Sequence, residues 1–176
     1  SEVHNINERL PLHLALQFNA SVDVINMLFK AYPQAVEIQD KYGNLPLHCA
    51  LSLRAPGSST IDIELLQMLL ESYPKATEVQ QKDGWLQLHL ALRYNASDDI
   101  INMLCKAYPK AAEVKNIYGW LPLHIALRYE ASSDVIKMLV DAFPGSTAIK
   151  NNDGKLPVDL YDGPQEKIRP LLTTSE

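Results

Sequence analysis

The chain has 176 residues, of which 47% are hydrophobic and 21% are charged, and its formal net charge is −5. This length allows one domain or two small ones, and the hydrophobic fraction excludes wholesale disorder. The acidic balance argues against nucleic acid as a partner, because phosphate binding needs a basic surface. Two cysteines make no disulfide framework, and the sequence shows no signal segment and no apolar run of about 18 residues that could cross a membrane. Composition therefore predicts an intracellular protein, cytoplasmic or nuclear, without a membrane partner.

One seven-residue pattern, Leu-Pro-Leu-His-x-Ala-Leu, recurs along the chain. It occupies residues 10–16, 45–51, 86–92 and 121–127, with Gln87 replacing the proline in the third copy, and a weaker fifth copy begins at residue 156. The steps from one histidine position to the next are 35, 41, 35 and 35 residues. The long step contains a turn-rich insert of six residues near 56–61. The chain is therefore an array of 35-residue repeats.

Each repeat unit is predicted to form two helices and a turn. A proline suits the first turn of the short first helix. The second helix has an apolar stripe around a Met-Leu pair, and an aromatic residue followed by proline ends it. An extended segment then leads to a turn at the glycine that stands five residues before the next histidine position. A unit this small cannot bury its own apolar face, so the repeats must stack into a solenoid.

These motifs resemble the ankyrin repeat, whose signature is Asp-x-x-Gly-x-Thr-Pro-Leu-His-x-Ala in a unit of about 33 residues. Residues 40–50 match every named position except the threonine, where Leu45 stands, and residues 116–126 match nearly as well. The resemblance implies an all-α solenoid of stacked helix-turn-helix repeats, with hairpin or extended loops between the repeats. We expect residues 1–176 to form a single domain of this kind.

The repeat boundaries follow from the spacing. We expect repeats at about 5–39, 40–80, 81–115 and 116–150, a C-terminal capping repeat at 151–176, and in residues 1–4 the tail of a preceding repeat. A last short helix is expected between Glu166 and Leu172. Because the first repeat has no polar cap of its own, we expect its outer face to be unusually apolar and to be covered by a neighbour.

The aligned histidines are not expected to bind a metal. Zinc ligands lie about 2.0–2.1 Å from one ion, whereas stacked helices lie about 8–10 Å apart, so histidines one repeat apart cannot share a zinc ion. In ankyrin proteins this histidine forms structural hydrogen bonds with the backbone near the repeat junction. The resemblance implies the same structural role for His13, His48, His89 and His124.

No pattern in the sequence predicts catalysis. Cys49 and Cys105 stand in apolar columns of the repeat, where a thiol is buried and inert. The sequence contains no glycine-rich phosphate loop, no paired catalytic carboxylates and no Ser/His/Asp constellation. We therefore expect no catalytic residue, no metal, no cofactor and no small-molecule substrate.

The resemblance also implies a binding surface. In ankyrin proteins the partner usually lies in the concave groove between the hairpin tips and the exposed side of the inner helices. Trp, Tyr and Arg are enriched at binding hot spots. The candidate partner-binding residues are Tyr42, Asn44, Trp85, Tyr118 and Trp120 at the tips, and Arg93, Tyr94, Arg128 and Tyr129 at the ends of the inner helices. The alternative is that the aromatics pack tip against tip and the arginines pair with nearby carboxylates.

Two functions are compatible with these features. The first is a non-catalytic protein–protein interaction module that binds a protein through the groove. In that case alanine at Trp85 and Trp120 should weaken partner capture without lowering the melting temperature. The alternative is a structural spacer or self-assembling scaffold that stacks through its uncapped N-terminal face.

Overall fold

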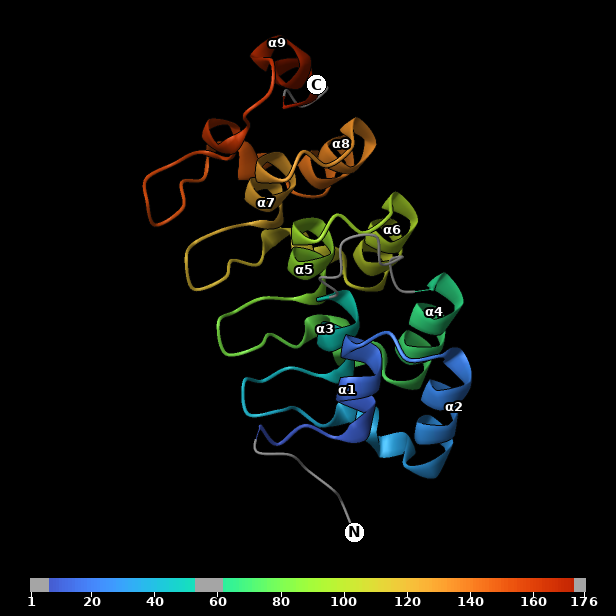
Figure 1. Cartoon of the computed structure of the whole chain (residues 1–176). Helices are drawn as coiled ribbons and strands as arrows, with labels where there is room; N and C mark the ends of the chain where they lie inside the picture. The colour runs from blue at the N-terminus through green and yellow to red at the C-terminus, as the bar shows by residue number, and fades with distance from the viewer. Residues whose placement is uncertain (1–6, 53–61, 173–176) are drawn as a thin grey trace.

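The computed structural model describes residues 7–52 and 62–172, and this part of the chain contains helices and turns but no strand. The helices form pairs that stack into an elongated array, with an inner row beside the hairpin loops and an outer row behind it (Figure 1). This arrangement confirms the predicted all-α solenoid. The pairs are α1 (Pro11–Gln17) with α2 (Val22–Ala31), α3 (Pro46–Leu51) with α4 (Ile63–Ser72), α5 (Gln87–Arg93) with α6 (Asp98–Ala107), and α7 (Pro122–Arg128) with α8 (Ser133–Ala142).

The segment that follows each outer helix differs from the predicted extended chain. The aromatic residue before the proline leaves the helical region, as Tyr32 does at φ −149° and ψ 81°. The proline then starts a new 3-10 helix, because its fixed φ suits a first helical turn. These helices are η1 (Pro33–Glu37), η2 (Pro74–Glu78), η3 (Pro109–Glu113) and η4 (Pro144–Ala148). A proline that ends one helix therefore begins another.

The last described segment of the chain packs back onto the fourth repeat. After η5 (Pro157–Leu160), the chain forms α9 (Gln165–Ile168) and η6 (Arg169–Leu171), where a last short helix was expected. Here η6 packs on α8, and Ile168 is only 3% exposed. The predicted insert near 56–61 and the predicted repeat tail at residues 1–4 lie outside the described residues.

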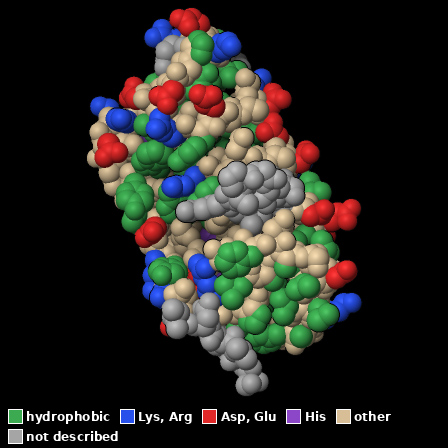
Figure 2. Space-filling view, viewed as in Figure 1, with side chains coloured by type: hydrophobic (Ala, Val, Ile, Leu, Met, Phe, Trp, Pro, Cys, Tyr) green, Lys and Arg blue, Asp and Glu red, His purple; other side chains and the backbone are tan. Residues whose placement is uncertain are grey.

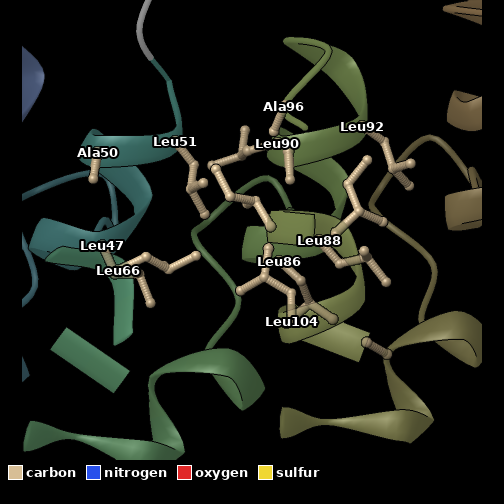
Figure 3. Packing of buried hydrophobic residues seen from close by; sticks show 14 of the residues in the cluster. Leu47, Ala50, Leu51, Leu66, Leu86, Leu88, Leu90, Leu92, Ala96 and Leu104 are labelled. Carbon is tan, nitrogen blue, oxygen red and sulfur yellow. The ribbon is translucent and has the colours of Figure 1, made fainter. Parts of the chain in front are cut away.

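The core runs along the array rather than around one centre. Leucines of α5 pack towards α3 on one side and reach Leu104 of α6 on the other (Figure 3). Equivalent leucines of successive inner helices are all buried, with Leu47 at 3%, Leu88 at 2% and Leu123 at 1% exposed. Each repeat thus buries its apolar face mainly against its neighbours.

A buried histidine links each inner helix to the next hairpin. We define the hairpins as residues 38–45, 79–86, 114–121 and 149–156. In every repeat, the histidine Nδ1 accepts a hydrogen bond from the backbone N–H three residues earlier, at 3.0–3.2 Å. The Nε2 atom donates to a carbonyl of the following hairpin. These bonds run from His13 to Asn44 (3.0 Å), His48 to Trp85 (3.3 Å), His89 to Val114 (3.1 Å) and His124 to Lys155 (3.3 Å).

The histidine network requires neutral rings, because a protonated ring could not accept at Nδ1. All four rings are fully buried. Burial lowers the pKa of each histidine, and it lowers the pKa of His48 and His89 to about 4. In the last copy, Asp159 replaces histidine. Its carboxylate accepts the same local bond from the Leu156 N–H at 2.8 Å.

The hairpins are also tied to one another. Asp40 Oδ1 accepts from the backbone N–H groups of Tyr42 and Asn44, both at 2.9 Å, and Asn116 and Asn151 do the same in their own hairpins. Backbone bonds join each tip to the next, from Lys82 N to Tyr42 O (2.9 Å), Ile117 N to Asp83 O (3.2 Å) and Asn152 N to Tyr118 O (3.1 Å). The tips therefore form a continuous, fixed edge.

We expect the chain to lose stability as the pH falls from 7 to 5. The folded pKa of His48 and His89 is about 4, against an ordinary value of 6.5, so the unfolded state takes up more protons in this window. The stabilisation is complete above pH 6.5 and is lost towards pH 4, with at most about 3 kcal/mol at stake for each histidine. Urea unfolding at each pH measures the change. An unchanged free energy of unfolding between pH 7 and pH 5 would contradict the buried neutral rings.

Gly119 and Gly154 have the same backbone conformation but different space around the Cα atom, so alanine at the two positions distinguishes backbone strain from steric crowding. Gly119 and Gly154 have φ values of +74° and +75°, so alanine at either position costs about 1–2 kcal/mol in backbone strain. A Cβ at Gly119 would also lie 2.9 Å from Asn152 N, whereas one at Gly154 would meet nothing within 4 Å. We expect Gly119→Ala to lower the free energy of unfolding by about 1 kcal/mol more than Gly154→Ala. Equal losses in urea unfolding would show that the hairpins are not closely packed.

Candidate functional site

The predicted tip residues of the first hairpin have different roles. Tyr42 projects from the tip with 49% of its surface exposed, and Lys41 Nζ lies 5.1 Å from the centre of its ring. Asn44 is half-buried, and its side-chain amide donates to both carboxylate oxygens of Asp40 at 3.1 Å. Tyr42 is therefore available to a partner, while Asn44 holds the hairpin together.

Asp40 itself is held as a carboxylate. Burial alone would raise its pKa, but hydrogen bonds from Asn44, Arg9 and the Tyr42 backbone outweigh that effect, and the pKa is lowered. Arg9 Nε lies 2.8 Å from Asp40 Oδ2. This ion pair thus connects the chain just before α1 to the hairpin of the next repeat.

Trp85 is not the exposed anchor that its position at a tip suggested. It is only 7% exposed. The guanidinium carbon of Arg93 lies 5.0 Å from the centre of its ring, and the ring of His89 meets it edge-on at 5.9 Å. Arg93 also lies 5.8 Å from the ring of Tyr94. The buried Trp85 ring therefore packs against the Arg93 guanidinium. This contact joins the base of the hairpin to the C-terminal end of α5.

The fourth repeat exposes more of its predicted site residues. Tyr118 is 52% exposed and Tyr129 is 39% exposed. Trp120 is half-buried, packs against the core cluster and lies 6.4 Å from the ring of His124. Arg128 pairs with Asp162 at 2.6 Å, and both side chains are largely exposed, at 46% and 72%. An exposed ion pair of this kind contributes about 0–1 kcal/mol to stability. Arg128 can therefore leave Asp162 and pair with another acceptor at little cost.

Ile117 is exposed on the same hairpin as Tyr118, although sequence reasoning did not select it. It is 53% exposed at the hairpin tip, beside Tyr118. The same column holds Lys41, Lys82 and Asn152 in the other hairpins. An isoleucine in an otherwise polar column was the signal that could have revealed it. We call the set Arg93, Ile117, Tyr118, Trp120, Arg128 and Tyr129 the aromatic–arginine surface.

Figure 2 shows hydrophobic side chains with lysines and arginines beside them on the left of the molecule, where the hairpins lie. Arg9 and Arg128 each contact a carboxylate, but no carboxylate within ion-pair distance of Arg93 is found among the described residues. The Arg93 guanidinium is thus fixed over two aromatic rings, with hydrogen-bond donors to spare.

The thiols are poorly suited to chemistry. Burial raises the pKa of both Cys49 and Cys105 to about 12, so both stay protonated at neutral pH. Across residues 7–52 and 62–172, no cluster of three or more His, Cys, Asp or Glu side chains could hold a metal ion. In the same part of the chain, no helix has the length and hydrophobicity needed to cross a bilayer.

The comparisons with known proteins agree with the repeat pattern and the helical stack. A family model for ankyrin repeats, comprising three copies, matches residues 58–153. No curated protein matches the chain at a significant level. Because the matched segment covers more than half of the sequence and the fold has the same helix pairs and hairpins, the chain belongs to the ankyrin repeat family.

Proposed function

We propose that this chain is a non-catalytic protein-binding module that engages a protein partner through the aromatic–arginine surface of its third and fourth repeats. Ankyrin repeats are in general protein-interaction modules and are generally not enzymes. The proposal adds a location to that general role. Exposed large hydrophobic side chains that gather on a fixed surface need a functional reason, because they lower solubility.

The observation that carries the proposal is the exposure of Ile117, Tyr118 and Tyr129 on rigid elements. Ile117 and Tyr118 lie on a hairpin whose backbone bonds to both neighbouring hairpins. Tyr129 directly follows α7, whose cap N–H groups are satisfied within the helix. A partner that binds such preorganised side chains loses little conformational entropy on the side of this protein.

Charge adds specificity to this surface. Arg93 is fixed over Trp85 and Tyr94, so it presents its N–H groups without first having to become ordered. Arg128 can exchange Asp162 for an acceptor of the partner, because that ion pair is exposed. We therefore propose that the partner places carboxylate or carbonyl oxygens against these arginines and apolar side chains against the tyrosines.

The test uses peptides selected from a random display library on the wild-type chain. Tyr118→Ser combined with Tyr129→Ser should weaken peptide binding at least tenfold and leave the melting temperature almost unchanged, because both side chains project into solvent. Phe18→Ser is the matched control, since Phe18 occupies the column of Tyr129 in the first repeat and is 74% exposed. Titration calorimetry measures both. If the control weakens binding and the double variant does not, the proposed location is wrong.

The two tryptophans should respond differently to alanine, contrary to the expectation from sequence that both are neutral for stability. Trp85 is 7% exposed, so Trp85→Ala should lower the free energy of unfolding by about 3–5 kcal/mol. Trp120 is half-buried, so Trp120→Ala should cost about half as much. Urea unfolding distinguishes the two variants. A Trp85→Ala variant as stable as wild type would contradict the buried position of this ring.

A further inference from the structure

Arg93 and Arg128 occupy the same position in neighbouring repeats, as the last residues of α5 and α7. The repeat does not need a charge at this position, because α1 ends at Gln17 instead. Arg128 Nη1 donates to the carboxylate of Asp162 at 2.6 Å, whereas no hydrogen bond or ion pair of the Arg93 guanidinium is found among the described residues. One of two equivalent arginines therefore has a carboxylate partner in its own chain, and the other does not.

The surroundings of Arg93 favour a carboxylate over other acceptors. Its guanidinium carbon lies 5.0 Å from the centre of the Trp85 ring and 5.8 Å from that of Tyr94. A guanidinium over aromatic rings keeps its N–H groups at the edge of its plane, where two of them can donate to the two oxygens of one carboxylate. A carbonyl offers a single oxygen and satisfies only part of this donor set. Arg93 is therefore prepared for a carboxylate that the described part of the chain does not supply.

Asp162 shows how a peptide segment can bring a carboxylate to this position. It lies in the segment that leads from η5 to α9 (Figure 1). Its side chain is 72% exposed and that of Arg128 is 46% exposed, so solvent weakens their attraction and another anion can reach the arginine. An acidic residue of a partner can therefore compete with Asp162 for Arg128.

Acidic side chains near the two arginines limit where a partner can carry negative charge. In the column of Tyr118, the neighbouring hairpins have Asp83 and Asp153. Glu130 is exposed and directly follows Tyr129 in the chain. A carboxylate placed against any of these acidic residues would meet a like charge. The partner therefore has to place its acidic side chains on the arginines, and neutral or basic side chains at the hairpin tips.

We propose that the partner carries a short segment with two acidic side chains, one of which binds Arg93 while the other replaces Asp162 on Arg128. This inference rests on the proposed function and names the chemistry of the partner at that surface. In the absence of the partner, Asp162 acts as an internal competitor at Arg128. It lowers the affinity of the chain for the acidic segment, and the partner has to displace it.

Peptides selected from a random display library on the wild-type chain test the chemistry of the partner. We expect the selected peptides to be richer in Asp and Glu than the unselected library. Their binding should weaken as sodium chloride is raised from about 0.05 M to about 0.5 M, because salt screens exposed charge pairs.

Arg93→Gln should weaken peptide binding about tenfold, because it removes a charge-assisted bidentate pair. Arg93→Lys keeps the charge over the rings but loses the planar fork, so its effect should be smaller than that of Arg93→Gln. Arg169→Gln is the matched control, since it removes the same charge from an exposed residue of η6, outside the aromatic–arginine surface. Titration calorimetry measures the affinities, and thermal unfolding by circular dichroism verifies that each variant folds.

Removal of the internal competitor should have the opposite effect. Asp162→Asn should strengthen binding of the same peptides about two- to fivefold, because the exposed ion pair that the partner has to replace is weak. Asp141→Asn is the matched control, since it removes the same charge from an exposed position on the outer helix α8.

Two results would overturn this inference and leave the proposed function intact. In the first, the peptides lose affinity for the double variant Tyr118→Ser and Tyr129→Ser but not for Arg93→Gln. In the second, Asp162→Asn changes binding no more than Asp141→Asn does. Peptides that bind the tyrosine and arginine variants as tightly as the wild type would instead contradict the proposed location, and this inference with it.

Discussion

The stack depends on a buried imidazole that must donate and accept a hydrogen bond at the same time. An inner helix of six or seven residues is too short to be stable alone, so its start has to be fixed from outside. The Nδ1 atom of the histidine fixes that start, and its Nε2 atom reaches the following hairpin. Only a neutral ring can do both. Helix formation and repeat stacking are therefore joined in one side chain. Protonation removes the Nδ1 acceptor and with it the bond that fixes the helix start, and it leaves a charge on a buried ring. Asp159 keeps the local bond alone, in the last copy of the motif.

Features that depend on one repeat and its chemistry could be predicted from the sequence. The histidine column, the glycine turns and the end of each outer helix at an aromatic-proline pair are of this kind. The 3-10 helices were missed because proline was taken only as the end of a helix, although its fixed φ also starts one. The burial of Trp85 was missed for a different reason. Its column holds Arg9, Asn44 and Trp120 elsewhere, and its exposure depends on Arg93, which lies over the ring.

The same logic explains why the candidate surface varies along the array. Backbone bonds between successive hairpins fix the position of each tip, so the side chains in the column of Tyr42 and Tyr118 are not needed to hold the stack together. They are free to differ, and they alternate, with tyrosine at Tyr42 and Tyr118 but aspartate at Asp83 and Asp153. The arginines at the helix ends differ as well, because Arg128 meets Asp162 of the segment that follows η5 and Arg93 meets two rings. Neighbouring repeats therefore share the same backbone structure but expose different side chains to a partner.

The two ends of the array are not equivalent, and this has an energetic consequence. In a solenoid, stability is approximately a sum over repeats and over the interfaces between neighbours. Among the described residues, the fourth repeat contacts the third repeat on one side and η5 and η6 on the other, whereas the first repeat contacts only the second. The α1–α2 pair should therefore be the first part of the described array to open. Anything that binds the folded α1–α2 pair therefore also stabilises it, by mass action. Binding to this pair and order in the first repeat are consequently linked, so a measurement of one reports on the other.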